Sequence, residues 1–148
     1  MNHKKQILIV GTYGIDVFHG ITDEMEMNDC IVIMASTPKS TLEQIKNRSF
    51  DAIIINLEPD GRGGVAEMDL LLAIGESRLQ ETAVCLGVSA QYPQSLPSMK
   101  SDKHFKILAG WLTLPIEPKD LMGHINEFIE SEHRLTIKEQ LGDTAHVI

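Results

Sequence analysis

The sequence predicts a three-layer α/β/α sandwich around a parallel sheet, and three observations support this fold class. Short apolar runs alternate along the chain with segments whose apolar residues recur at helical spacing. The runs are apolar throughout, which is typical of strands buried on both faces. With 148 residues, of which 43% are hydrophobic, the chain has the size of one domain with a single sheet. Strands separated by helices form right-handed βαβ units, and such units build a parallel sheet.

Five apolar runs are expected to form the strands. In chain order they are Ile7–Val10, Cys30–Ala35, Ala52–Ile55, Ala83–Val88 and Trp111–Leu114. Five strands with helical crossovers fit a flavodoxin-like sheet with the strand order 2-1-3-4-5. In sheets of this kind, ligands and chemistry are found at the carboxyl ends of the strands.

Four of the segments between and after these runs have clear helical signals. Their apolar positions are Phe18, Ile21 and Met25; Leu42 and Ile45; Val65, Met68, Leu71 and Leu72; and Leu121, Ile125, Phe128 and Ile129. Thr37-Pro38 predicts an N-cap followed by proline in the first turn, and Pro118 opens the last helix. The segment Gln91–Lys106 contains two prolines and several serines, so its helix is predicted to be short or irregular.

The charge and the cysteines exclude several function classes. The formal net charge is −8, which disfavours nonspecific binding to nucleic acid or to an anionic membrane. No apolar run approaches the length of a membrane-spanning helix or a signal-peptide core, so we expect a cytoplasmic protein. Cys30 and Cys85 are predicted to be buried, reduced strand residues. The six histidines show no metal-binding spacing, and we expect no metal and no cofactor.

The third predicted strand ends in an unusual residue. Asp51-Ala-Ile-Ile-Ile-Asn56 resembles the third strand of response-regulator receiver domains, in which the last residue is the phosphate-accepting aspartate. Val88-Ser89-Ala90 resembles the hydroxyl-containing end of the fourth strand in that family, and Leu114-Pro115 stands in place of its lysine-proline pair. Trp111 occupies the place of a switching aromatic residue. The resemblance covers roughly residues 5 to 130 and implies a CheY-like fold.

The same resemblance argues against phosphorylation. Active receivers use two acids after the first strand, an acceptor aspartate, a hydroxyl and a lysine, and here those positions are Gly11, Thr12, Asn56, Ser89 and Leu114. An amide has no nucleophilic carboxylate oxygen, and Mg²⁺ prefers anionic oxygen ligands. Only the hydroxyl remains, so the resemblance implies a pseudo-receiver that lacks the phosphoacceptor. We therefore expect no enzymatic activity and a signalling role through phosphorylation-independent protein contacts.

Two alternatives remain open from the sequence. The first is a flavodoxin-like domain that binds a small ligand or a nucleotide at the carboxyl edge, near Gly11 and Asn56. A glycine-rich loop there would offer backbone N–H groups and a guanidinium to an anion; its residues are Gly61, Arg62, Gly63 and Gly64. The second is a receiver phosphorylated at a different acid, with Asp16 as the nearest candidate.

The resemblance also suggests where partners would bind. In receivers the fourth helix, fifth strand and fifth helix form an interaction face, which would here include Trp111 and Pro115 and could bind a protein partner or a second copy. The competing interpretation, which we favour, places the Trp111 side chain over the core. The receiver-like domain is expected to span residues 1–130. Residues 131–148 are expected to form a helical extension or tail, with no contact to nucleic acid or membrane.

Overall fold

The computed structural model describes residues 4–11, 19–56, 64–89, 107–113 and 116–140. Its sheet has five parallel strands in the order β2-β1-β3-β4-β5, which confirms the predicted topology and the predicted fold class. The strands are β1 (Lys5–Gly11), β2 (Cys30–Ala35), β3 (Ala52–Asn56), β4 (Val84–Ser89) and β5 (Leu108–Thr113). Within the described ranges, no helix is long and apolar enough to cross a membrane.

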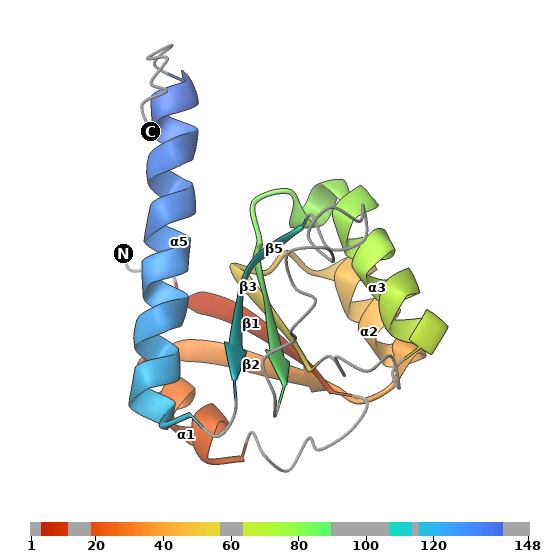
Figure 1. Ribbon diagram of the computed structural model, residues 1–148, viewed down its shortest axis with the longest axis horizontal. Helices are drawn as coiled ribbons and strands as arrows, with labels where there is room; N and C mark the ends of the chain where they lie inside the picture. Colours follow the sequence, from red (N-terminus) through yellow and green to blue (C-terminus); the bar gives the residue numbers. More distant parts are fainter. Residues whose placement is uncertain (1–3, 12–18, 57–63, 90–106, 114–115, 141–148) are drawn as a thin grey trace.

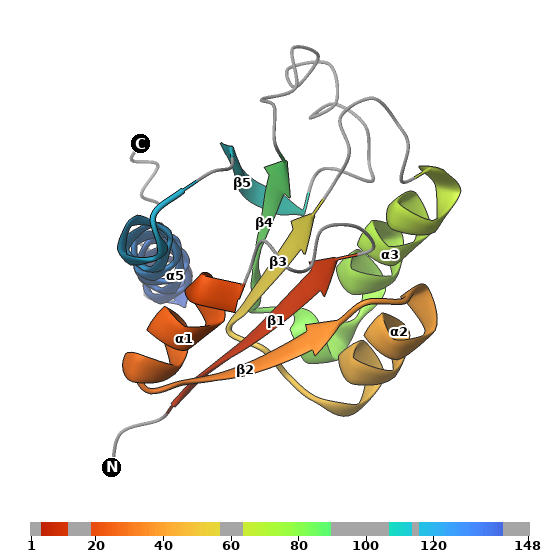
Figure 2. The ribbon, with the colours of Figure 1, turned by 90° about the horizontal axis from the view of Figure 1, so that it is seen from below.

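Helices cover both faces of the sheet, as Figure 2 shows. On one face lie α1 (His19–Met27) and α5 (Pro118–Gln140), and on the other lie α2 (Pro38–Asn47) and α3 (Gly64–Glu76). A short 3-10 helix, η2 (Arg78–Gln80), connects α3 to β4. The strands and helices of Figure 1 therefore form the expected three layers.

Two apolar clusters fill the spaces between these layers. The cluster under α1 and α5 contains Ile7, Ile9 and Ile54 together with Leu121 and Ile125. The cluster on the opposite face contains Leu8, Phe50, Ile53, Ile55, Leu70, Leu71 and Trp111. Alternate residues of β1 and β3 therefore point into different clusters, as the pleat of a strand requires. This arrangement explains why these runs are apolar at every position rather than at every second one.

The predicted start of the second helix is confirmed in detail. The Thr37 hydroxyl accepts a hydrogen bond from the Ser40 backbone N–H at 3.0 Å, and the Ser40 hydroxyl accepts one from the Thr37 N–H at 3.3 Å. This reciprocal pair forms a capping box, and Pro38 occupies the first turn, where it needs no N–H partner. The local sequence alone thus determines where α2 begins.

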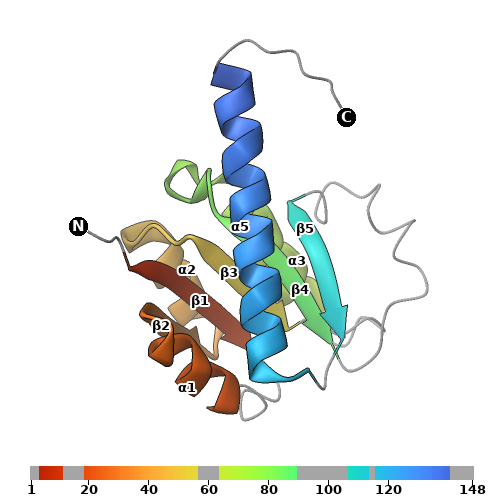
Figure 3. The same cartoon turned by 90° about the vertical axis from the view of Figure 1, so that its left-hand side faces the viewer.

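The fifth strand is longer than predicted, and the last helix continues into the predicted C-terminal extension. Strand β5 begins at Leu108 instead of Trp111, because its first residues pair with β4 through a bulge: Cys85 lies opposite Leu108, but Leu86 lies opposite Gly110. Helix α5 runs without interruption from Pro118 to Gln140 and projects beyond the sheet in Figures 1 and 3. The expected boundary at residue 130 therefore falls inside one continuous helix.

Candidate functional site

The carboxyl ends of three strands bring several predicted site residues together. Gly11 is the last residue of β1 and Asn56 the last residue of β3, and the two lie opposite each other in the parallel register. On the other side of β3, Asn56 lies opposite Val88, directly before Ser89 at the end of β4. Parallel pairing thus gathers Gly11, Asn56 and Ser89 at one edge of the sheet. This is the edge at which open α/β sheets hold ligands.

Asn56 is the central residue of this edge. It belongs to the middle strand, and its side chain is buried, with 9% of its surface exposed. Its neighbour Gly11 is also buried and has no side chain with which to coordinate a cation. A carboxamide is neutral at all physiological pH values and is neither a strong metal ligand nor a nucleophile. The described part of this edge therefore presents no carboxylate where β1 and β3 end.

The remaining predicted site positions are only partly described. Outside the described residues lie Thr12, Asp16, Gly61, Arg62, Gly63, Leu114 and Pro115. Gly64 is the first residue of α3. The proposed anion loop and the position equivalent to the receiver lysine therefore remain sequence predictions.

Trp111 belongs to the core, which agrees with the favoured of its two interpretations and argues against the other, an exposed interaction anchor. Only 9% of its surface is exposed, and it packs within the cluster under α2 and α3. Its ring lies over Gly87 of the adjacent strand, where a built Cβ would come within 2.8 Å of the ring. The absence of a side chain at Gly87 thus leaves room for the indole. The physical reason is register: Trp111 pairs with Gly87 in the sheet, and this places the ring over the neighbouring strand.

The acid that opens the third strand has a structural role at the opposite end of the sheet. An oxygen of the Asp51 carboxylate accepts a hydrogen bond from the Gln6 backbone N–H at 2.7 Å. The Asp51 backbone N–H donates to the Gln6 carbonyl at 2.8 Å, and the Asp51 carbonyl accepts from the Val84 N–H at 3.0 Å. Asp51 therefore connects the starts of β1, β3 and β4. It lies at the end of β3 that is distant from Asn56.

Gln80 is a polar core residue that sequence reasoning missed. It is 4% exposed, and its side-chain carbonyl accepts from the Phe50 N–H at 3.1 Å. Its amide group donates to the Ile45 carbonyl at 3.0 Å and to the Arg48 carbonyl. One side chain thus satisfies three backbone groups between α2 and β3. No local motif marks this role, because its partners lie at least 30 residues away along the chain.

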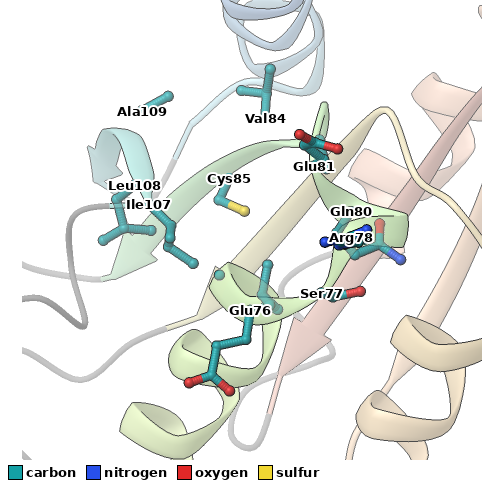
Figure 4. A pocket seen from close by; sticks show the side chains of 13 residues that line it. Glu76, Ser77, Arg78, Gln80, Glu81, Val84, Cys85, Ile107, Leu108 and Ala109 are labelled. Atoms are coloured by element: carbon teal, nitrogen blue, oxygen red, sulfur yellow. The ribbon is translucent and has the colours of Figure 1, made fainter.

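A cavity of about 460 Å³ also lies at the amino end of the sheet, between η2 and the starts of β4 and β5 (Figure 4). Glu76, Arg78 and Glu81 contribute its charged groups, and Cys85 and Ile107 contribute to its apolar wall. Neither Gly11 nor Asn56 lines it. This cavity is therefore separate from the edge at which a ligand was expected.

The two cysteines are free thiols in the core, as predicted. Burial raises the pKa of the Cys85 thiol from 9.0 to about 12. Burial also raises the pKa of Cys30. Both side chains are consequently protonated at neutral pH and are poor nucleophiles.

Metal-binding geometry is absent from the described ranges, in which no three His, Cys, Asp or Glu side chains gather to hold an ion. His124 instead lies 3.8 Å from the Glu127 carboxylate, one helical turn away on α5. Both side chains are exposed, so this contact adds little to stability.

Comparison with solved structures identifies the fold. No family model and no curated protein matches the chain. A CheY-like receiver domain from Methanospirillum hungatei superposes with a TM-score of 0.69 at 20% identity, covering 89% of this chain and 98% of the receiver. A response regulator from Thermotoga maritima gives 0.70 at 14% identity, covering 86% and 99%. A structure described as adenylate cyclase from Rhodopirellula baltica gives 0.67 at 19% identity, covering 96% and 99%. At these identities the likeness establishes a shared CheY-like fold.

Proposed function

We propose that this chain is a receiver-like signalling domain that acts through protein contacts and is not phosphorylated at the end of β3. The observation that supports the proposal is Asn56, a buried amide at the strand end where the resembled family carries its acceptor aspartate. The CheY-like fold supports a place in two-component-type signalling. Protein partners are the expected targets, since receiver domains generally work by binding other proteins.

The chemistry of the edge supports the loss of phosphorylation. Transfer of a phosphoryl group to a receiver needs an attacking carboxylate and a divalent cation that neutralises the developing charge. Gly11 lies opposite Asn56 and offers no oxygen from a side chain. Because both the nucleophile and an acidic metal ligand are replaced, no single residue can compensate. We therefore assign the chain no catalytic activity.

The direct test is incubation with acetyl phosphate and Mg²⁺, followed by mass spectrometry of the intact protein. An active receiver treated in the same way is the positive control. We expect no added phosphoryl group on the wild-type chain. A hydroxylamine-sensitive phosphate on the wild-type chain would overturn the proposal and favour a receiver that uses another acid, such as Asp16.

A single reversion sharpens the test. Asn56→Asp restores the acceptor, but Gly11, Thr12 and Leu114 still lack the acids and the lysine. We expect this variant to remain unphosphorylated and to bind no Mg²⁺ at millimolar concentration. Efficient phosphorylation of Asn56→Asp would show that the rest of the site is intact, and the chain would then be a receiver inactivated at one position.

A further inference from the structure

The two outer strands of the sheet differ in how their free edges are protected. Each pairs on one side only among the described strands, β2 with β1 and β5 with β4. Strand β5 carries a bulge near Leu108 and Gly110, and bulges disrupt pairing with a further strand. Strand β2 pairs with β1 in regular register over all six residues and has no bulge. Its outer edge is therefore a regular template for another strand.

The residues of β2 also lack the usual protection of an edge. Its sequence, Cys-Ile-Val-Ile-Met-Ala, contains neither a charged residue nor a proline, two of the features that block pairing at a sheet edge. Ile31 is 38% exposed and Met34 is 39% exposed, on opposite faces of the sheet, and Met27 just before the strand is 80% exposed. Two of the four large hydrophobic residues exposed in the described ranges thus belong to β2, and a third, Met27, is the last residue of α1, three positions before the strand begins.

We infer that the β2 edge binds a second copy of this chain, with the two β2 strands antiparallel across a two-fold axis. A two-fold axis brings identical surfaces together, so like charges meet unless the surface is neutral or its charges alternate correctly. The whole chain has a net charge of −8, but β2 itself is uncharged. The β2 strands of two copies can therefore pair without placing like charges opposite each other in the ladder.

The charges that flank β2 favour the antiparallel direction. Asp29 precedes the strand, whereas Lys39 lies in the first turn of α2 after it, and both are exposed. Antiparallel pairing places the amino end of one β2 beside the carboxyl end of the other. Asp29 of one copy then approaches Lys39 and the amino end of α2 in its partner, where a negative charge is favourable. Parallel pairing would instead bring the two Asp29 residues together.

The test is the oligomeric state of the full chain, measured by analytical ultracentrifugation over a wide range of protein concentration. We expect a reversible dimer. Ile31→Lys or Met34→Lys should raise its dissociation constant by about tenfold, because each dimer carries the change twice in its ladder. Leu79→Lys is the matched control, since Leu79 is 43% exposed but lies on η2. A wild-type chain that stays monomeric, or equal sensitivity to Leu79→Lys, would overturn the inference.

A second pair of variants tests whether the two β2 strands pair in the antiparallel direction, without altering β2 itself. Lys39→Glu would bring like charges together and should weaken the antiparallel dimer. Asp29→Asn in that background should recover part of the affinity, and asparagine tolerates the positive φ of 61° at this position. Both residues are exposed, so folding, checked by circular dichroism, should be unaffected. A dimer indifferent to both changes would contradict the antiparallel arrangement.

Discussion

At the amino end of the sheet polar side chains connect distant elements, whereas at the carboxyl end β1 and β3 finish in a glycine and an amide. Asp51 and Gln80 bind backbone groups of neighbouring strands and of the α2–β3 connection. The Lys5 ammonium donates to the side chain of Asn126 on α5. Gly11 and Asn56 occupy the opposite edge. The two ends of the sheet therefore differ in what their side chains do: those at the amino end hold separate elements together by hydrogen bonds, whereas β1 and β3 end without a charged side chain at the carboxyl edge.

The largest loss of stability is expected from a substitution at the amino end of the sheet. Gln80→Leu would leave the Phe50 N–H and two carbonyls without their partner, and we expect it to lower the free energy of unfolding by about 3 kcal/mol. Chemical denaturation followed by circular dichroism measures this change. Gln6→Leu is the matched control, because the Gln6 side-chain oxygen is buried with no hydrogen-bond partner in the described structure. Equal losses in the two variants would show that the Gln80 hydrogen bonds are not the cause.

A smaller loss of stability is expected when negative charge is introduced at the carboxyl end of the sheet. The triple variant Gly11→Asp, Thr12→Asp, Asn56→Asp adds carboxylates at the paired strand ends Gly11 and Asn56 and at the residue that follows Gly11, with no cation to neutralise them. Only 9% of the Asn56 surface is exposed, so the carboxylate there is also buried. Repulsion between the added carboxylates, together with the burial of their charge, should lower the free energy of unfolding by roughly 1–3 kcal/mol in chelator. Thermal melting in the presence of chelator tests this. A triple variant as stable as the wild type would count against these positions being neighbours.

The smallest expected change in stability depends on pH and involves Cys85, which lies near the amino end of the sheet. Because the pKa of Cys85 rises from 9.0 in the reference state to about 12 in the fold, the unfolded chain loses this proton first as the pH rises. The contribution of the protonated Cys85 thiol to the free energy of unfolding is therefore fully present below pH 9 and is lost between pH 9 and 12. At pH 10 the loss should be about 1 kcal/mol. Denaturation at pH 8 and pH 10 measures it, and Cys85→Val should lose correspondingly less stability over the same interval.

Much of the fold was predictable from local patterns. The five apolar runs marked the strands, and their alternation with helical segments predicted a parallel sheet with the observed order. Thr37 and Pro38 predicted the start of α2, because capping depends only on residues within one turn. The neighbourhood of Gly11 and Asn56 followed from the resemblance together with the rule that parallel strands end at one edge.

Other features were decided only when the chain folded. The sequence showed that an aromatic residue stands at position 111, but its burial depends on Gly87 in the adjacent strand and on the register that pairs them. The role of Gln80 depends on backbone groups of α2 and of the segment before β3, which no window of local sequence contains. By itself the sequence determined the order of elements and the presence of an amide, Asn56, at the end of the third strand, because both depend on short runs of residues. The tertiary structure alone decided which side chains are buried and which outer strand pairs in regular register, because these depend on contacts between segments far apart in the chain.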